Sequence, residues 1–257
     1  MPGVSSTYFG PAASRPVIRG LEADRIRVLQ NGLNTMDASS ASPDHGVSFD
    51  TSNLKSIEVV RGPATLLYGS NAIGGVVNAL DGRIIDEKLA AGTVRGSMGG
   101  RFTSVDQGYQ THFSLDGGLG HGLAAHVEGF TRAAEDFRLP GGEVAPNTYL
   151  RAEGFTAGMS HVWDGGYVGF AWTEYHSRYG SPAAQDIFID LYQSRLDLRG
   201  AFYKPTALIK EINWRFAWSD YEHTEFETGM DNTVFKTDGY DLRIEAKHEK
   251  SRAWRAS

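Results

Sequence analysis

The stretch that decides the fold is Ile57-Glu-Val-Val-Arg-Gly-Pro-Ala-Thr-Leu-Leu-Tyr-Gly-Ser-Asn-Ala-Ile-Gly-Gly-Val-Val-Asn78. Its first part is a short apolar run that is typical of a β-strand. The residues Ala64-Thr-Leu-Leu-Tyr68 then predict a short helix, which Gly69 ends because glycine readily takes the left-handed conformation found after helices. The glycines that follow do not make a phosphate-binding loop, since no Lys-Ser or Lys-Thr pair comes after them.

The same sequence pattern extends over residues 1–88, where short apolar runs alternate with turns rich in Gly, Pro, Ser and Asp. The run Arg25-Ile-Arg-Val-Leu-Gln30 predicts a strand, and Asn31-Gly32 directly after it predicts a tight hairpin turn. We therefore interpret residues 1–88 as one compact α+β domain.

Residues 89–257 follow a different pattern, in which large apolar side chains fall on every second position, as in Ile212, Trp214 and Phe216. Successive side chains of a strand point to opposite faces, so each such segment predicts a strand with one apolar and one charged face. Eight strands are expected, near residues 93–105, 108–118, 122–133, 152–163, 166–178, 187–203, 208–223 and 233–249. Turns are expected at Asp116-Gly-Gly118, Pro140-Gly-Gly142 and Asp164-Gly-Gly166.

Composition excludes several classes of protein. The chain has 257 residues, a formal net charge of −6 and no cysteine. The lack of cysteine rules out disulfide scaffolds, thiolate metal sites and cysteine nucleophiles. A negative charge without a Lys/Arg cluster argues against nucleic acid as a partner. No nucleophile–base–acid set emerges from the sequence, so the chain is not expected to be an enzyme.

The alternation by itself leaves two architectures open. In a soluble β-sheet protein the apolar faces would share a core, and the chain would bind a ligand without transport activity. In an outer-membrane barrel the apolar faces would meet lipid, and no long apolar run would be needed. Several expected strands exceed the usual five or six residues, which favours the barrel.

Four pieces of the N-terminal domain resemble, in order and spacing, the plug domain of TonB-dependent outer-membrane receptors: residues 15–20, 25–32, 57–63 and 67–78. The signature positions are Arg19, Gly20, Arg61, Gly62, Pro63, Tyr68, Gly69, Gly74 and Gly75. The resemblance implies an α+β plug (residues 1–88) followed by antiparallel transmembrane strands (residues 89–257) of a barrel of about 22 strands. It also implies import across the outer membrane of a Gram-negative bacterium, driven by the TonB complex, without covalent chemistry or a cofactor.

Further segments resemble the branch of this family that contains the outer-membrane zinc receptor: residues 42–45, 81–84, 126–130, 179–182 and 220–223. The zinc receptor carries a histidine- and acid-rich insertion after its Tyr-Gly-x-Pro segment. Here Ser181-Pro-Ala-Ala-Gln-Asp186 leads directly into the next expected strand. Zinc, haem and a ferric siderophore therefore all stay open as the transported ligand.

Asp44 and His45 are the candidate metal ligands of the plug, because carboxylate oxygen and imidazole nitrogen are natural zinc ligands. The resemblance to the zinc branch implies that this pair contributes to a metal site. His223 and Glu225 lie two residues apart on one strand and share a face, so they could complete the site. Two ordinary interpretations stay open, in which Asp44 caps a turn and His223 and Glu225 belong to a solvated loop.

Two further pairs have structural interpretations. His126 and Glu128 share a strand face and are interpreted as ordinary lumen lining. Arg19 and Arg61 are candidates for ion pairs with Glu58 or with barrel carboxylates, which would hold the plug in the lumen.

Eight strands cannot close a barrel of about 22, because barrel diameter grows with strand number. We therefore expect an internal fragment of a longer receptor, without its signal peptide, TonB-contacting box and C-terminal strands. The remaining expected partners are outer-membrane lipid and a small metal-containing ligand.

Overall fold

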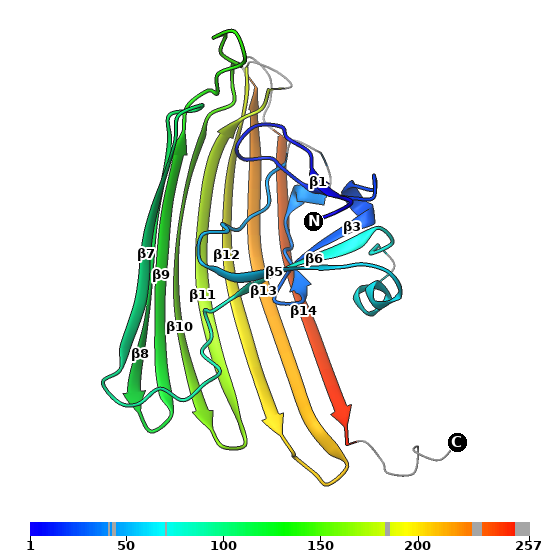
Figure 1. The fold of residues 1–257 in the computed structure, drawn as a ribbon, viewed down its shortest axis with the longest axis vertical. Helices are drawn as coiled ribbons and strands as arrows, with labels where there is room; N and C mark the ends of the chain where they lie inside the picture. Colours follow the sequence, from blue (N-terminus) through cyan, green and yellow to red (C-terminus); the bar gives the residue numbers. More distant parts are fainter. Residues whose placement is uncertain (41, 43–44, 70, 183–185, 228–232, 250–257) are drawn as a thin grey trace.

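The computed structural model describes residues 1–257 except 41, 43–44, 70, 183–185, 228–232 and 250–257. It has two parts, a small N-terminal domain and a tall curved sheet that lies along one side of it (Figure 1). We call the domain that contains β1–β6 the plug and the sheet of β7–β14 the wall.

The plug contains six short strands and three 3-10 helices: β1 (Val4–Ser6), β2 (Pro16–Ile18), η1 (Ala23–Arg25), β3 (Ile26–Gln30), β4 (Leu33–Asn34), η2 (Ala38–Ser40), β5 (Leu54–Val60), η3 (Pro63–Tyr68) and β6 (Gly75–Asp81). Its main sheet has the order β4-β3-β6-β5, in which β3 and β6 are parallel. The expected turn joins β3 to β4, and both Asn31 (φ 53°) and Gly32 (φ 81°) have the positive φ that such two-residue hairpins require.

The wall is an antiparallel meander of eight long strands: β7 (Val94–Thr103), β8 (Gly108–Gly120), β9 (Leu123–Ala134), β10 (Leu150–Trp163), β11 (Gly166–Gly180), β12 (Ile187–Tyr203), β13 (Ile209–Glu227) and β14 (Thr233–His248). Neighbours in sequence are neighbours in the sheet, whose edges are β7 and β14. All eight expected strands are present at the expected places, and the predicted fold class is confirmed.

The two faces of the wall differ as the alternation predicts. On β13 the residues Ala217, Ser219 and Tyr221 are buried on the face that contacts the plug. On the other face, Trp172 of β11 stacks on Trp218 of β13 with ring centroids 5.9 Å apart. Aromatic residues in such positions form the girdles of membrane barrels. Among the described residues, no helix has the length and apolar character needed to cross a membrane.

One expected turn is wrong. Asp116-Gly117-Gly118 lies inside β8, and the chain turns three residues later at His121 and Gly122. The glycine at 118 serves close packing instead, because a Cβ there would lie 2.1 Å from the carbonyl oxygen of Ala90. The segment before β7 therefore packs directly on the wall at this point.

The main apolar core lies between the wall and the plug. Its buried members are Ala134, Leu150, Ala152, Tyr175, Tyr179, Ile189, Leu191 and Tyr221. Ala12 and Ala38 of the plug pack against this cluster. A smaller cluster of Leu29, Ala72 and Val76 closes the interior of the plug. The plug thus rests on the wall through apolar contacts at the end of the strands where β11 ends and β12 begins.

Candidate functional site

His45, His223 and Glu225 meet where a plug loop touches the wall. One ligand atom of each side chain lies within 4.8 Å of the other two. His223 and Glu225 project from one face of β13, and His45 comes from the loop that follows η2. The His45 side chain is 3% exposed and that of His223 is fully buried, whereas the Glu225 side chain is 28% exposed. Three of the four residues predicted as ligands therefore lie together, and the fourth, Asp44, lies outside the described residues.

The hydrogen bonds of His45 indicate that a positive charge is needed between its Nε2 and Glu225. Its Nδ1 lies 3.0 Å from the carbonyl oxygen of Ala38, which can only accept, so Nδ1 carries a proton and donates it. Its Nε2 lies 2.8 Å from Oε1 of Glu225, which as a carboxylate also only accepts. A neutral His45 would then point a lone pair at a negative oxygen. A proton or a metal ion between the two atoms removes this repulsion.

His223 brings a second imidazole nitrogen close to the same oxygen atom, Oε1 of Glu225. Its Nε2 lies 3.5 Å from Oε1 of Glu225, and the Tyr221 hydroxyl lies 3.0 Å from its Nδ1. The two imidazole rings meet edge to face with centroids 4.4 Å apart, and Phe235 of β14 contacts both rings edge to face. The rings are therefore held by packing and by their outer nitrogens, as metal-binding histidines usually are.

Polar contacts at its base hold the loop that carries His45. Oδ1 of Asp37 accepts from the Ser39 amide and hydroxyl at 3.1 and 2.5 Å. Its Oδ2 accepts from the Ser48 amide and hydroxyl at 3.1 and 3.0 Å. Beside His45, the amide of Gly46 donates to the Tyr179 hydroxyl of β11 at 2.9 Å. Asp37 therefore connects Ser39 to Ser48 across the loop, and Tyr179 holds Gly46 against the wall.

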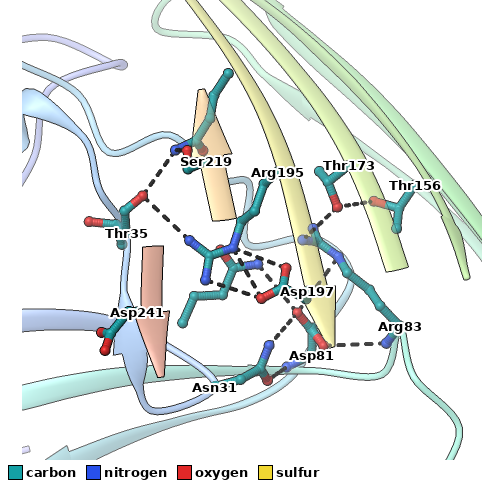
Figure 2. Close-up of polar contacts among 12 residues, drawn as sticks. Asn31, Thr35, Asp81, Arg83, Thr156, Thr173, Arg195, Asp197, Ser219 and Asp241 are labelled. Carbon is teal, nitrogen blue, oxygen red and sulfur yellow. Dashed lines mark hydrogen bonds and ion pairs between the residues drawn. The ribbon is translucent and has the colours of Figure 1, made fainter. Parts of the chain in front are cut away.

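A second group of contacts joins the plug to the wall around Asp81 and Arg83 (Figure 2). Oδ1 of Asp81 lies 3.2 Å from Nη2 of Arg199 on β12, and its Oδ2 lies 3.7 Å from Nε of Arg83. Arg83 also donates to Glu128 on β9 at 2.7 Å. Burial acts to raise the pKa of Asp81, but Arg199, Arg83 and hydrogen bonds from amide side chains outweigh it and hold the pKa well below its ordinary value.

Arg195 of β12 makes a third connection between the two parts. Its side chain is buried, pairs with Asp197 at 3.0 Å and donates from Nη1 to the backbone oxygen of Asn34 at 2.9 Å. Gln193 donates to the backbone oxygen of Thr35 at 2.9 Å. Figure 2 shows Arg195 pointing toward Thr35, the residue directly after β4. The wall thus holds the strand that leads into the His45 loop.

Sequence reasoning assigned the plug–wall ion pairs to other arginines. In the described part of the chain neither Arg19 nor Arg61 lies within ion-pair distance of a carboxylate. Arg61 donates instead to the backbone oxygen of Pro2 at 3.0 Å, and Arg19 has a positive φ of 51° at the turn after β2. The pairing residues Asp81 and Arg83 stand just past the sequence signature, where a short Asp-Gly-Arg segment gave no periodic signal.

The family profile "TonB-dependent Receptor Plug Domain" matches residues 1–76. Residues 1–76 are thus similar to the plug domains of TonB-dependent receptors. Most of the remaining signature positions lie at its turns and short helix, namely Gly20, Gly62, Pro63, Tyr68, Gly69 and Gly74, and Gly75 begins β6.

Proteins that match the plug and the wall together show the same similarity. The chain is 28% identical over 194 residues to the vitamin B12 transporter BtuB of Photobacterium profundum, which is 72% of this chain and 31% of that protein. The copper transporter OprC has a TM-score of 0.81 at 14% identity, over 97% of this chain and 39% of that one. The ferric yersiniabactin uptake receptor FyuA of Yersinia pestis has a TM-score of 0.74 at 17% identity, over 98% and 42%.

These similarities fix the architecture and the location. The solved structures share the fold of a plug domain with a barrel wall, and the chain spans less than half the length of each relative. Proteins with this plug domain lie in the outer membrane of Gram-negative bacteria, and the predicted localisation is confirmed. The relatives are transporters and receptors, which also confirms the prediction that the chain is not an enzyme.

Proposed function

We propose that this chain is part of a TonB-dependent transporter that imports a metal ion or a metal chelate across the outer membrane. The observation that carries the proposal is the cluster of His45, His223 and Glu225, in which a plug loop and a wall strand supply ligand atoms to one point. Two imidazoles and one carboxylate form a donor set suited to zinc and neighbouring first-row divalent metals. Zinc is therefore the first ion to test, with haem and ferric siderophores as the other predicted ligands.

The division of the cluster between plug and wall supports gating by plug movement. His45 belongs to a loop anchored in the plug, whereas His223 and Glu225 belong to β13. Any shift of the plug relative to the wall would separate His45 from the other two ligands and lower the affinity for a shared ion. We infer that the TonB complex supplies the force for this shift. The domain boundary after residue 88 stays a prediction.

Calorimetric titration of the chain in detergent micelles tests the proposed ligand. We expect zinc to bind. We expect His45→Ala to weaken binding by at least about 100-fold, since loss of an outer-shell partner alone costs about 10- to 100-fold and a direct ligand contributes more. His248→Ala is the matched control, because His248 is exposed at the end of β14. Equal zinc affinity in the chain and the His45→Ala variant would overturn the site.

Haem and a ferric siderophore are titrated in the same way. A ligand that binds tightly to both the unaltered chain and the His45→Ala variant would move the proposal from a free metal ion to a chelate held by other groups. The alternative of a soluble ligand-binding protein predicts a monodisperse chain without detergent, and recovery only in detergent would contradict it.

A further inference from the structure

A second cluster of ligand atoms lies elsewhere on the wall, around His126 of β9. The His126 side chain is 3% exposed and Glu128, two residues on, is 5% exposed, and both face the plug. With Asp116 of β8 they line a cavity of about 230 Å³, closed on the plug side by residues 52–55 and Gly82. Ser97 and Ser114 add hydroxyl groups to the lining. The cavity is thus lined by carboxylate, imidazole and hydroxyl groups.

This cavity is separate from the cluster at His45. The register of the wall connects His126 through Gly158, Ala171 and Asp197 to Ala217 of β13. His223 lies six positions farther along β13, which is roughly 20 Å at about 3.3 Å per residue. The four strand steps between β9 and β13 add roughly 19 Å in the perpendicular direction, at about 4.8 Å each. One ion cannot contact both clusters.

The contacts of His126 place a positive charge, carried by the ring or by a bound cation, between Asp116 and Glu128. Its Nδ1 lies 2.7 Å from Oδ1 of Asp116, which only accepts, so Nδ1 carries the proton. Its buried Nε2 makes no hydrogen bond, and the nearest carboxylate atom is Oε2 of Glu128 at 3.4 Å. A neutral ring would therefore turn its lone pair toward a carboxylate in a buried place. As at His45, a second proton on the ring or a metal ion between the two atoms removes this repulsion.

The outer contacts of both groups have the form found at metal sites. Asp116 orients the imidazole through Nδ1, and Nε of Arg95 holds Asp116 at 2.8 Å. Arg83 binds the other oxygen of Glu128, Oε1, at 2.7 Å, which leaves Oε2 for a further partner. Metal-bound histidines almost always donate their other ring N–H to a carboxylate, a backbone carbonyl or water, and here Asp116 takes that place. Two atoms each about 2.0–2.1 Å from a tetrahedral zinc ion lie roughly 3.4 Å apart, which is the spacing seen here.

We propose that Nε2 of His126 and Oε2 of Glu128 bind a divalent cation of the zinc class at the plug–wall interface, in addition to the site at His45. Water and the hydroxyls of Ser97 and Ser114 complete its coordination. Lys55 also lines the cavity but makes no ion pair with a carboxylate of the described residues.

Zinc titration tests this site in a chain whose first site has been removed by His45→Ala and His223→Ala. We expect that double variant to retain one zinc ion per chain. Adding His126→Ala lowers the remaining affinity at least about 100-fold, and adding Asp116→Asn lowers it about 10- to 100-fold. Adding His112→Ala is the matched control, because His112 lies on β8 outside the cavity lining and leaves the affinity unchanged.

The outcomes separate this proposal from the function proposed above. Loss of all zinc in the double variant, or an affinity that His126→Ala does not change, would overturn the second site and leave the first intact. His126→Ala alone, in the otherwise native chain, is expected to leave one zinc ion at His45. X-ray absorption of zinc bound to the double variant reports the ligands of the second site without a substitution in that site. One imidazole with oxygen ligands supports the proposal, and two or more imidazoles refute it.

Discussion

Asp81 is the group whose replacement should loosen the plug most. It is buried, accepts from Asn31 at 2.7 Å, and lies between Arg199 of the wall and Arg83. Asp81→Asn preserves size but removes the negative charge that balances two arginines. Removing one partner of a buried ion pair costs about 3–5 kcal/mol, because the other charge stays buried. At about 1.4 kcal/mol per factor of ten, the opening equilibrium of the plug rises by roughly two to four orders of magnitude.

Hydrogen exchange of the β3 and β6 amides measures this opening, because these strands pair in the centre of the plug. We expect exchange there to accelerate by the factor given above in Asp81→Asn. Asp24→Asn is the control, since Asp24 is exposed on η1 and makes no ion pair in the described part of the chain. Equal exchange rates in the two variants would refute the view that Asp81 fastens the plug.

The same residue predicts a dependence on pH. The pKa of Asp81 in the folded chain lies below its ordinary value of 3.8. A carboxyl group with a depressed pKa adds stability above its ordinary pKa and loses it as pH falls toward the folded pKa. Protection of β3 and β6 should therefore fall as pH drops below about 4. In Asp81→Asn this part of the pH dependence should be absent, and its persistence would assign it to another carboxyl group.

Three further predictions concern the loop and the wall. Asp37→Ala removes four hydrogen bonds from the ends of the His45 loop. We expect faster proteolysis within residues 37–48. We also expect the zinc affinity to be at least about tenfold weaker, because each lost bond of this kind costs about 1–3 kcal/mol. Tyr179→Phe leaves the Gly46 amide without its acceptor, and we expect zinc affinity to fall by a factor of about five to ten with unchanged wall stability. Phe216→Arg places a charge on the lipid-facing side of β13 and should cost about 2–4 kcal/mol of stability in vesicles, whereas Asn213→Arg on the opposite face should cost less than about 1 kcal/mol.

The strands of the wall could be predicted because their apolar and polar side chains alternate with a period of two residues. Each strand alternates apolar and polar side chains over ten or more residues, so Trp214, Phe216 and Trp218 identify one face without any tertiary information. The turn predicted at Asp116-Gly-Gly118 was wrong because a tertiary contact, not a turn, explains the glycine at 118. The glycine at 118 accommodates the backbone at Ala90, and a local turn rule cannot detect a neighbour 28 positions away.

The candidate site was predictable only in part, for a related reason. The two-residue spacing of His223 and Glu225 places them on one face of a strand whatever the rest of the fold does. Nothing in the spacing brings His45 to them, because that contact depends on how the plug sits against β13. Of the groups that fix this seating, Arg195 belongs to no motif, and Asp81 stands in a segment (residues 81–84) whose resemblance to the family indicated no contact with the wall. They were found only from the structure.

The pair of His126 and Glu128 shows the limit of the ordinary interpretation. Lumen-lining polar residues usually contact water or each other through matched donors and acceptors. Here Asp116 and Arg83 occupy the outer atoms of the pair, and the two inner atoms both act as acceptors when His126 is neutral. The same unmatched facing pair occurs between His45 and Glu225, where sequence reasoning expected a metal. If a mismatch of acceptors is the physical mark of a cation site at His45, the same mark at His126 calls for the same ion.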